Sequence, residues 1–296
     1  MTGRPLLEPL PADVALPRPH THDINVPAPD RWRRRAGPDV TNTWTMAGLR
    51  WGEPSPRPPL VLVHGLVVAA RMCAPTARRL AVGGTVLAPD LPGCGRSSKP
   101  YPVPTIPELG AALASWLPAA TAGPAVLVGV SVGTQIVIDA AVRASHRVSA
   151  VVLVSPTVDR QRRRWCSQLW RWQLEQATQS MRMKRIQFSD YRRGGVGRGL
   201  RTFRAALADR PEDKLPRLTM PVLICRGTRD PLVSSSWVRE LCGHARDARL
   251  AILPGTVHAM SHDNPVELSR AVLGFLDDMT RGRGGEPVVL RTEVPR

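Results

Sequence analysis

The sequence predicts an α/β fold: a mostly parallel sheet with helices on both faces and a small helical lid inserted between two strands. Short continuous apolar runs recur along the chain, and such runs are typical of buried parallel strands. Helix-like stretches lie between these runs, and this alternation favours a parallel sheet with right-handed crossovers. In such a sheet, functional residues are expected at the carboxyl ends of the strands.

The elements are expected in a regular order. Residues 41–51 alternate in part, which predicts one or two short strands, and the proline-rich residues 55–59 end them. Buried strands are expected at residues 60–63, 85–88, 125–128, 150–154, 221–225 and 249–253. Helices are expected at residues 74–82, 106–117, 132–144 and 265–279.

The chain divides into three regions, and the second contains an insertion. Residues 1–38 are rich in proline and include an arginine cluster, so we expect a poorly ordered leader. Residues 39–280 are expected to form the α/β domain, and residues 281–296 a loose tail. Residues 156–217 hold 16 basic and 6 acidic residues and no convincing strand, which we interpret as the helical lid. The glycine-rich run 194–199 inside the lid is interpreted as a flexible connection.

A pentapeptide between a strand and a helix carries the candidate nucleophile. Gly129-Val130-Ser131-Val132-Gly133 follows one of the apolar runs and begins a helix pattern. A serine at such a turn needs strained backbone for its Oγ to project, and the positions two before and two after it crowd neighbouring elements. Ser131 could be only a helix cap, but this setting favours a nucleophile elbow.

A serine nucleophile needs a base, and the base needs an acid that orients it. His258 follows the last strand, at the edge expected for Ser131, and is favoured over His262, which is expected to pack or cap near the final helix. Asp230 also follows a strand, and the order serine, acid, histidine is the order expected for this architecture. Asp159, which follows the strand before that, is the alternative acid.

The oxyanion of an acyl-transfer reaction needs two hydrogen-bond donors. The backbone N–H of Val132 is one predicted donor, and that of Leu66, in the loop after residues 60–63, is the other. The expected pocket wall is apolar and consists of Leu66, Val67, Val68, Val132, Val257, Met260 and tryptophans of the lid. Such a wall suits an ester or lactone with an apolar part.

The formal net charge is +17, and 38 of the 41 lysine and arginine residues are arginine. We interpret this as a compositional bias, because no nucleic-acid-binding motif accompanies the charge, and we expect no nucleic-acid partner. Weak association of the lid and leader with acidic lipid is the alternative.

The sequence also bears on the cellular compartment in which the protein is expected. No apolar run reaches the length of a membrane span, and the first 30 residues lack the apolar core of a secretory signal, so a cytoplasmic protein is expected. The five cysteines are scattered without a CxxC pair, which favours free thiols over disulfides or a metal site.

Five motifs together resemble the serine-nucleophile branch of the α/β-hydrolase fold family. They are the segments at residues 62–65, 90–97, 129–133, 227–231 and 255–258. The resemblance implies a Ser131–His258–Asp230 triad, an acyl-enzyme, a small-molecule substrate and no cofactor. Two positions depart from the family pattern: Val132, where many members have methionine or a similar residue, and Thr134, which replaces a common third glycine. Both are expected to reshape the pocket.

The function predicted first is hydrolysis of a carboxylic ester or lactone. Two alternatives stay open at this point. One is an enzyme of the same fold that hydrolyses C–C bonds or transfers an acyl group. The other is a non-catalytic binding protein on a hydrolase scaffold.

Overall fold

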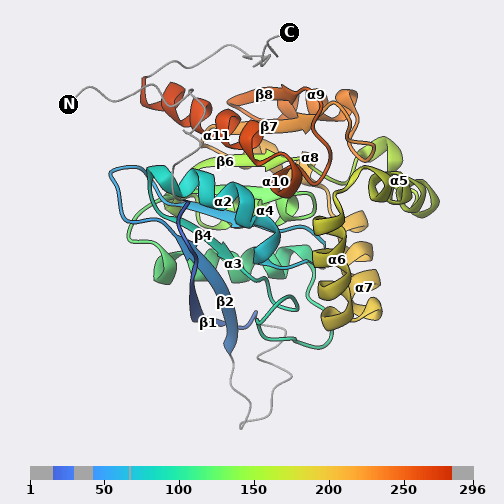
Figure 1. Cartoon of the computed structure of the whole chain (residues 1–296), viewed down its shortest axis with the longest axis horizontal. Helices are drawn as coiled ribbons and strands as arrows, with labels where there is room; N and C mark the ends of the chain where they lie inside the picture. The colour runs from blue at the N-terminus through green and yellow to red at the C-terminus, as the bar shows by residue number, and fades with distance from the viewer. Residues whose placement is uncertain (1–15, 30–42, 67, 282–296) are drawn as a thin grey trace.

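The computed structural model describes residues 16–29, 43–66 and 68–281. These residues form one eight-stranded sheet with the order β1-β2-β4-β3-β5-β6-β7-β8 (Figure 1). β2 is antiparallel to its neighbours β1 and β4, and the other neighbours are parallel. The strands are β1 (His20–Pro27), β2 (Thr43–Trp51), β3 (Leu60–Val63), β4 (Val86–Pro89), β5 (Ala125–Val130), β6 (Val148–Val154), β7 (Val222–Gly227) and β8 (Ala248–Leu253). The predicted fold class is confirmed.

The sheet separates two apolar cores, because successive side chains of a strand point to opposite faces. In β3, Val61 and Val63 join the core that contains side chains of α3, α4 and α9. Leu60 and Leu62 join the core that contains side chains of α2 and α11. The helices are α2 (Ala74–Leu80), α3 (Ile106–Ala120), α4 (Gly133–Arg143), α9 (Ser235–His244), α10 (Met260–Asp263) and α11 (Pro265–Thr280).

The prediction of a poorly ordered leader is wrong for residues 16–29. Here β1 pairs with the whole of β2, from His20 opposite Arg50 to Pro27 opposite Thr43. Ile24 and Val26 alternate toward the core, and Val26 is fully buried. Apolar burial and pairing with the edge of β2 therefore offset the conformational entropy that this strand loses on folding. Residues 1–15 and 30–38 of the predicted leader, and 282–296 of the predicted tail, lie outside the described residues.

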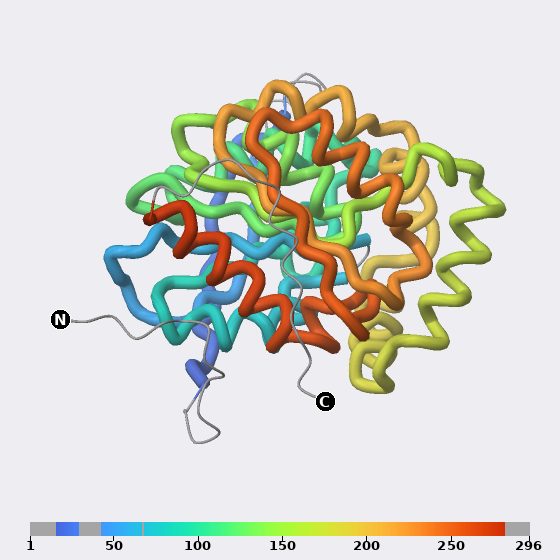
Figure 2. The backbone as a smooth tube through the Cα atoms, turned by 90° about the horizontal axis from the view of Figure 1, so that it is seen from above, coloured from blue at the N-terminus to red at the C-terminus, as the bar shows by residue number. Residues whose placement is uncertain are grey.

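The chain between β6 and β7 is helical, as expected for the lid. It contains α5 (Trp165–Thr178), α6 (Met181–Gly194), α7 (Val196–Ala208) and α8 (Pro211–Lys214). Figure 2 shows α5 projecting beyond one side of the sheet. None of the helices in the described ranges is long and apolar enough to cross a membrane.

The glycine-rich run 194–199 is not the flexible connection that we expected. α6 ends at Gly194, α7 begins at Val196, and only Gly195, with φ 80°, lies between them. Gly197 and Gly199 belong to α7, and Gly199 is buried. The positive φ at Gly195 ends one helix and allows the next to begin immediately, which suits glycine because it has no Cβ.

Candidate active site

Ser131 occupies a strained turn between β5 and α4. Its φ is 55°, a left-handed value that non-glycine residues rarely adopt. A Cβ at Gly129 would lie 2.6 Å from the Gly133 carbonyl oxygen, and one at Gly133 would lie 2.5 Å from the Val63 carbonyl oxygen. The elbow thus packs closely against both its own helix and β3, and the expectation that both flanking positions crowd neighbouring elements is confirmed.

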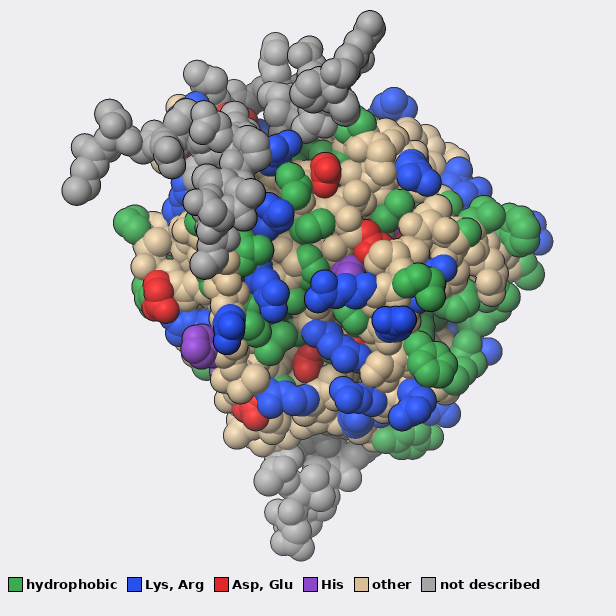
Figure 3. Space-filling view, in the orientation of Figure 1, with side chains coloured by type: hydrophobic (Ala, Val, Ile, Leu, Met, Phe, Trp, Pro, Cys, Tyr) green, Lys and Arg blue, Asp and Glu red, His purple; other side chains and the backbone are tan. Residues whose placement is uncertain are grey.

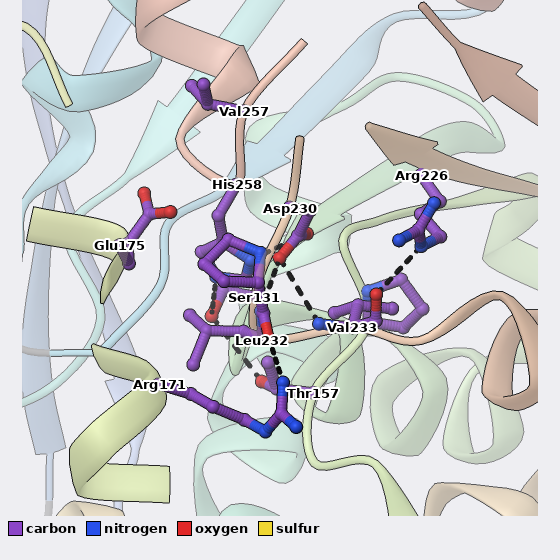
Figure 4. A network of polar contacts seen from close by, with 12 residues as sticks. Ser131, Thr157, Arg171, Glu175, Arg226, Asp230, Leu232, Val233, Val257 and His258 are labelled. Carbon is purple, nitrogen blue, oxygen red and sulfur yellow. Dashed lines mark hydrogen bonds and ion pairs between the residues drawn. The ribbon is translucent and has the colours of Figure 1, made fainter. Parts of the chain in front are cut away.

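The structure brings the three predicted side chains together in one hydrogen-bonded series (Figure 4). His258 Nε2 lies 2.9 Å from Ser131 Oγ. His258 Nδ1 lies 2.9 Å from Asp230 Oδ2. These residues follow β5, β7 and β8, so three carboxyl ends of one sheet edge supply them.

Asp230 is held from several sides. The backbone N–H groups of Leu232 and Val233 donate to its Oδ1 over 2.8 Å and 3.2 Å. Arg226 Nε donates to the Val233 carbonyl over 2.7 Å and so fixes the same loop (Figure 4). Burial alone would raise the pKa of Asp230, but the charge and hydrogen bond of His258 and the N–H of Leu232 bring that pKa below its ordinary value. The carboxylate therefore stays ionised.

The environment of His258 favours its protonated form. Burial alone would lower the pKa of His258, but the charge and hydrogen bond of Asp230, together with the charge of Glu175, raise it above its ordinary value of 6.5. A base of this kind has a strong affinity for a proton taken from Ser131.

The structure does not bring the rival residues into this series. Asp159 is buried at the start of a short 3₁₀ turn, where it accepts hydrogen bonds from Gln161 N–H at 3.0 Å and Ser234 Oγ at 2.6 Å. His262 Nδ1 lies 2.8 Å from Asp263 Oδ1, within α10. Both side chains are engaged elsewhere, so geometry favours Asp230 and His258.

The residues of both predicted oxyanion donors line one narrow apolar pocket. Leu66 and Val132 both line it, with Leu91, Leu109 and Ile136 among the other lining residues. Neither backbone N–H donates to another of the described residues. Val132 immediately precedes α4, whose N-terminal dipole favours negative charge.

His64 holds the loop that carries Leu66. Its Nε2 accepts from the Leu91 N–H over 3.0 Å, so the proton lies on Nδ1, which contacts the Gly65 carbonyl at 2.9 Å. Burial lowers the pKa of His64 and keeps the ring neutral. Gly65 approaches the elbow so closely that an added Cβ would lie 3.2 Å from Ser131 Cβ. His64 is thus a positioning residue for this loop.

Sequence reasoning missed two residues beside the series. Thr157 Oγ1 lies 3.4 Å from Ser131 Oγ. Glu175 is 1% exposed on α5 and interacts with His258 through its charge. Figure 4 shows Glu175 on the lid, next to the loop of His258. Periodicity alone does not indicate which flank of a lid helix meets the rest of the protein, so the burial of Glu175 was not predicted.

The expectation that lid tryptophans line the pocket is wrong for the pocket beside Leu66 and Val132, whose lining among the described residues includes no tryptophan and neither Val68, Val257 nor Met260. Val67, which was expected there too, lies outside the described residues. Trp165 and Trp170 are 37% and 66% exposed. Trp172 is half-buried and contacts Tyr191 of α6, with ring centroids 6.5 Å apart. The narrow pocket is instead closed on the lid side by Arg198 and Thr202 of α7.

Comparison with known proteins agrees with this architecture. The model of the Alpha/beta hydrolase family matches residues 60–271. The chain belongs to the alpha/beta hydrolase family. A curated relative of this chain is a pimeloyl-[acyl-carrier protein] methyl ester esterase from Nitrosospira multiformis. The two are 27% identical over 237 residues, and the match covers 68% of this chain and 88% of the relative.

Solved structures share the fold of this alpha/beta hydrolase. A membrane phospholipase A matches with a TM-score of 0.71 and 20% identity, over 88% of this chain and 87% of that one. A bromoperoxidase from Bacillus anthracis matches with a TM-score of 0.71 and 18% identity, over 87% of this chain and 100% of that one. Those proteins differ in the chemistry that their names state, so the likeness concerns the fold.

Proposed function

We propose that this alpha/beta hydrolase cleaves a carboxylic ester or lactone that has an apolar part. The observation that carries the proposal is the continuous series from Ser131 Oγ through His258 to Asp230, with 2.9 Å at each step. The esterase activity named for the Nitrosospira multiformis relative supports the reaction class.

In the proposed first step, Ser131 Oγ attacks the acyl carbonyl carbon while His258 Nε2 takes the hydroxyl proton. Asp230 remains ionised, keeps the Nδ1–H tautomer and stabilises the imidazolium. The backbone N–H groups of Leu66 and Val132 receive the negative charge that develops on the carbonyl oxygen. His258 then gives its proton to the leaving alcohol oxygen, and an acyl-enzyme remains on Ser131.

In the second step, a water molecule attacks the acyl-enzyme and gives a proton to His258. The same two N–H groups hold the second oxyanion, and Ser131 regains its proton as the acid leaves. Both steps balance without a redox change, so this mechanism requires neither a metal ion nor an organic cofactor.

The pocket beside the oxyanion donors supports the apolar part of the substrate. Its lining includes Leu91, Pro92, Val103, Leu109 and Ile136, with few polar side chains. Apolar lining of this kind favours an acyl or alcohol group that buries hydrocarbon surface on binding. A cytoplasmic location for the enzyme stays a prediction.

The test combines a covalent probe with turnover. The wild type and Ser131→Ala are incubated with a fluorophosphonate and their intact masses are measured, and p-nitrophenyl acetate and butyrate hydrolysis is followed on the same samples. We expect one adduct and steady turnover for the wild type, and neither for Ser131→Ala. Absence of both in a folded wild type would contradict the proposal. An adduct without turnover of any ester or lactone would favour a binding protein on a hydrolase scaffold.

A further inference from the structure

The helix α5 buries polar side chains and exposes apolar ones, which is the reverse of an ordinary amphipathic surface helix. Its fully buried side chains are polar, Gln168 and Glu175. Four of its large apolar side chains are exposed, with Trp170 at 66% and Leu169 at 48%, while Trp172 is half-buried. A surface helix usually buries its apolar stripe, because removing that stripe from water is the main gain of packing. Here these side chains remain largely in water, although Trp165 at the start of the helix packs on Phe203 of α7.

The exposed apolar surface continues onto α6. Met181 and Phe188, seven residues apart and hence two turns along that helix, are 65% and 69% exposed. We call the set Trp165, Leu169, Trp170, Leu174, Met181 and Phe188 the lid face. Eight of the eleven exposed large hydrophobic side chains of the described residues lie on α5, α6 and α7. This concentration distinguishes the lid from the rest of the surface, where such residues are isolated.

Aromatic contacts hold the lid helices together as one surface. The rings of Trp165 on α5 and Phe203 on α7 pack edge to face with centroids 4.9 Å apart. Trp172 on α5 contacts Tyr191 on α6 in the same way at 6.5 Å. Projecting apolar side chains are thus presented by helices that are fixed relative to one another.

Charge is segregated between the inside and the outside of the lid. Of the six acidic residues at positions 156–217, five are buried, and only Asp213 is exposed. Ten arginines of the same segment are exposed. The buried acids are neutralised internally, for example by Arg163 on Glu212 at 2.7 Å and Lys214 on Asp209. The outer surface is therefore almost purely basic, and Figure 3 shows blue side chains between the green ones over this region.

We propose that the lid face binds the surface of an anionic lipid bilayer. Tryptophan, leucine, methionine and phenylalanine side chains would enter the boundary between headgroups and acyl chains, where amphipathic tryptophan is favoured. The surrounding arginines would stay at headgroup level, their stems on the apolar layer and their guanidinium groups on phosphates. A bilayer fits better than a folded acidic protein, because the apolar side chains project from convex helices rather than line a groove.

Vesicle sedimentation tests this proposal without any measurement of catalysis. The full chain is mixed with vesicles of phosphatidylcholine alone or of phosphatidylcholine with phosphatidylglycerol, at low and high salt. We expect binding to the anionic vesicles that is at least about ten-fold tighter than to neutral ones and that weakens with salt. Absence of binding to anionic vesicles at low salt would overturn the proposal.

Matched variants separate the lid face from general charge. Trp170→Glu with Leu174→Glu should weaken binding by at least about ten-fold, because it places carboxylates in the apolar layer. Val82→Glu, at a 45% exposed position after α2 and outside the lid, is the control and should bind like the wild type. Arg182→Glu with Arg185→Glu should weaken binding more than the same charge change at exposed Arg50 and Arg239. Equal effects for the lid and control variants would contradict the assignment.

Two further measurements exclude other occupants of the lid face. Soluble polyglutamate should compete poorly with vesicles, and effective competition would mean that charge alone drives binding. Light scattering should show that Trp170→Glu with Leu174→Glu leaves the oligomeric state unchanged, because a dimer that buries the lid face would overturn the proposal. Ser131→Ala should bind vesicles like the wild type, so this proposal and the proposed hydrolase activity stand or fall separately.

Discussion

Arg71 Nη2 lies 2.5 Å from Asp190 Oδ1, and this ion pair joins the segment after β3 to α6 of the lid. The other oxygen of Asp190 accepts the backbone N–H of Ala69 over 3.0 Å. Asp190 is 5% exposed. The lid is thereby bonded to the same segment that carries the predicted oxyanion donor Leu66, so disturbance of one is expected to reach the other.

Replacement of Asp190 by alanine should weaken both the fold and the proposed catalysis. It would leave the buried Ala69 N–H without its acceptor and the Arg71 guanidinium with only the Ile186 carbonyl, at a cost of about 1–3 kcal/mol of unfolding free energy. We also expect a lower kcat/KM on p-nitrophenyl esters, because the loop of Leu66 loses a support. Urea unfolding and ester kinetics measure the two effects. Asp213→Ala, at the exposed acid of the lid, should change stability by less than about 0.5 kcal/mol, and an equal loss there would refute the argument.

The identity of the acid can be decided by two amide variants. Asp230→Asn should reduce kcat by roughly 10⁴-fold, because His258 would lose the partner that fixes its tautomer. Asp159→Asn should retain most activity, since Asp159 bonds Ser234 and Gln161 and not His258. Ser131→Ala should lose about 10⁴–10⁶ in kcat. A large loss at position 159 with little at 230 would reverse the assignment of Asp230.

The pH dependence should report the two carboxylates that face His258. His258 acts as a base only when neutral, and Asp230 and Glu175 raise its pKa, so kcat/KM should rise with pH through an apparent pKa above 6.5. Glu175→Gln removes one negative charge, which favours the neutral imidazole and should move that apparent pKa down. Glu53→Gln, at an exposed remote site, should leave it unchanged. An upward movement in Glu175→Gln would show that Glu175 acts otherwise.

Two glycine-to-alanine changes should have opposite signs. At Gly133 the new Cβ would lie 2.5 Å and 2.6 Å from the carbonyl oxygens of Val63 and His64, so we expect a loss of about 1–3 kcal/mol or more, together with lower activity. At Gly197 in α7 no atom lies within 4 Å of the new Cβ. Alanine there should stabilise the protein by about 0.5–1 kcal/mol, because it favours the helix. Thermal and urea unfolding compare them, and destabilisation at Gly197 would contradict its place in the helix.

Most of the sheet could be predicted because its information is local. Runs such as Leu60–Val63 are apolar throughout, and a continuous run of this kind is compatible with burial on both faces. The elbow at Ser131 is also local, since its strand, turn and helix are adjacent in sequence. The positions of Asp230 and His258 follow from one topological rule about the carboxyl ends of parallel strands.

Other features could not be predicted because they depend on distant partners. β1 ends at Pro27 and β2 begins at Thr43, so their pairing joins residues that are well separated in the sequence. The prolines around β1 resembled those of a disordered leader. Asp190 meets Arg71 across 119 positions of sequence. Neither partner carries a local pattern that indicates the other.

The sequence by itself determined the fold class, the order of the buried parallel strands along the chain and the candidate nucleophile, base and acid, because periodicity and short motifs encode them over a few residues. Only the tertiary structure decided which flank of α5 faces His258 and which faces outward. An isolated helix with both tryptophan and glutamate carries no preference that fixes this choice. Packing against α6 and α7 sets it, leaving Glu175 buried beside the site and Trp170 exposed.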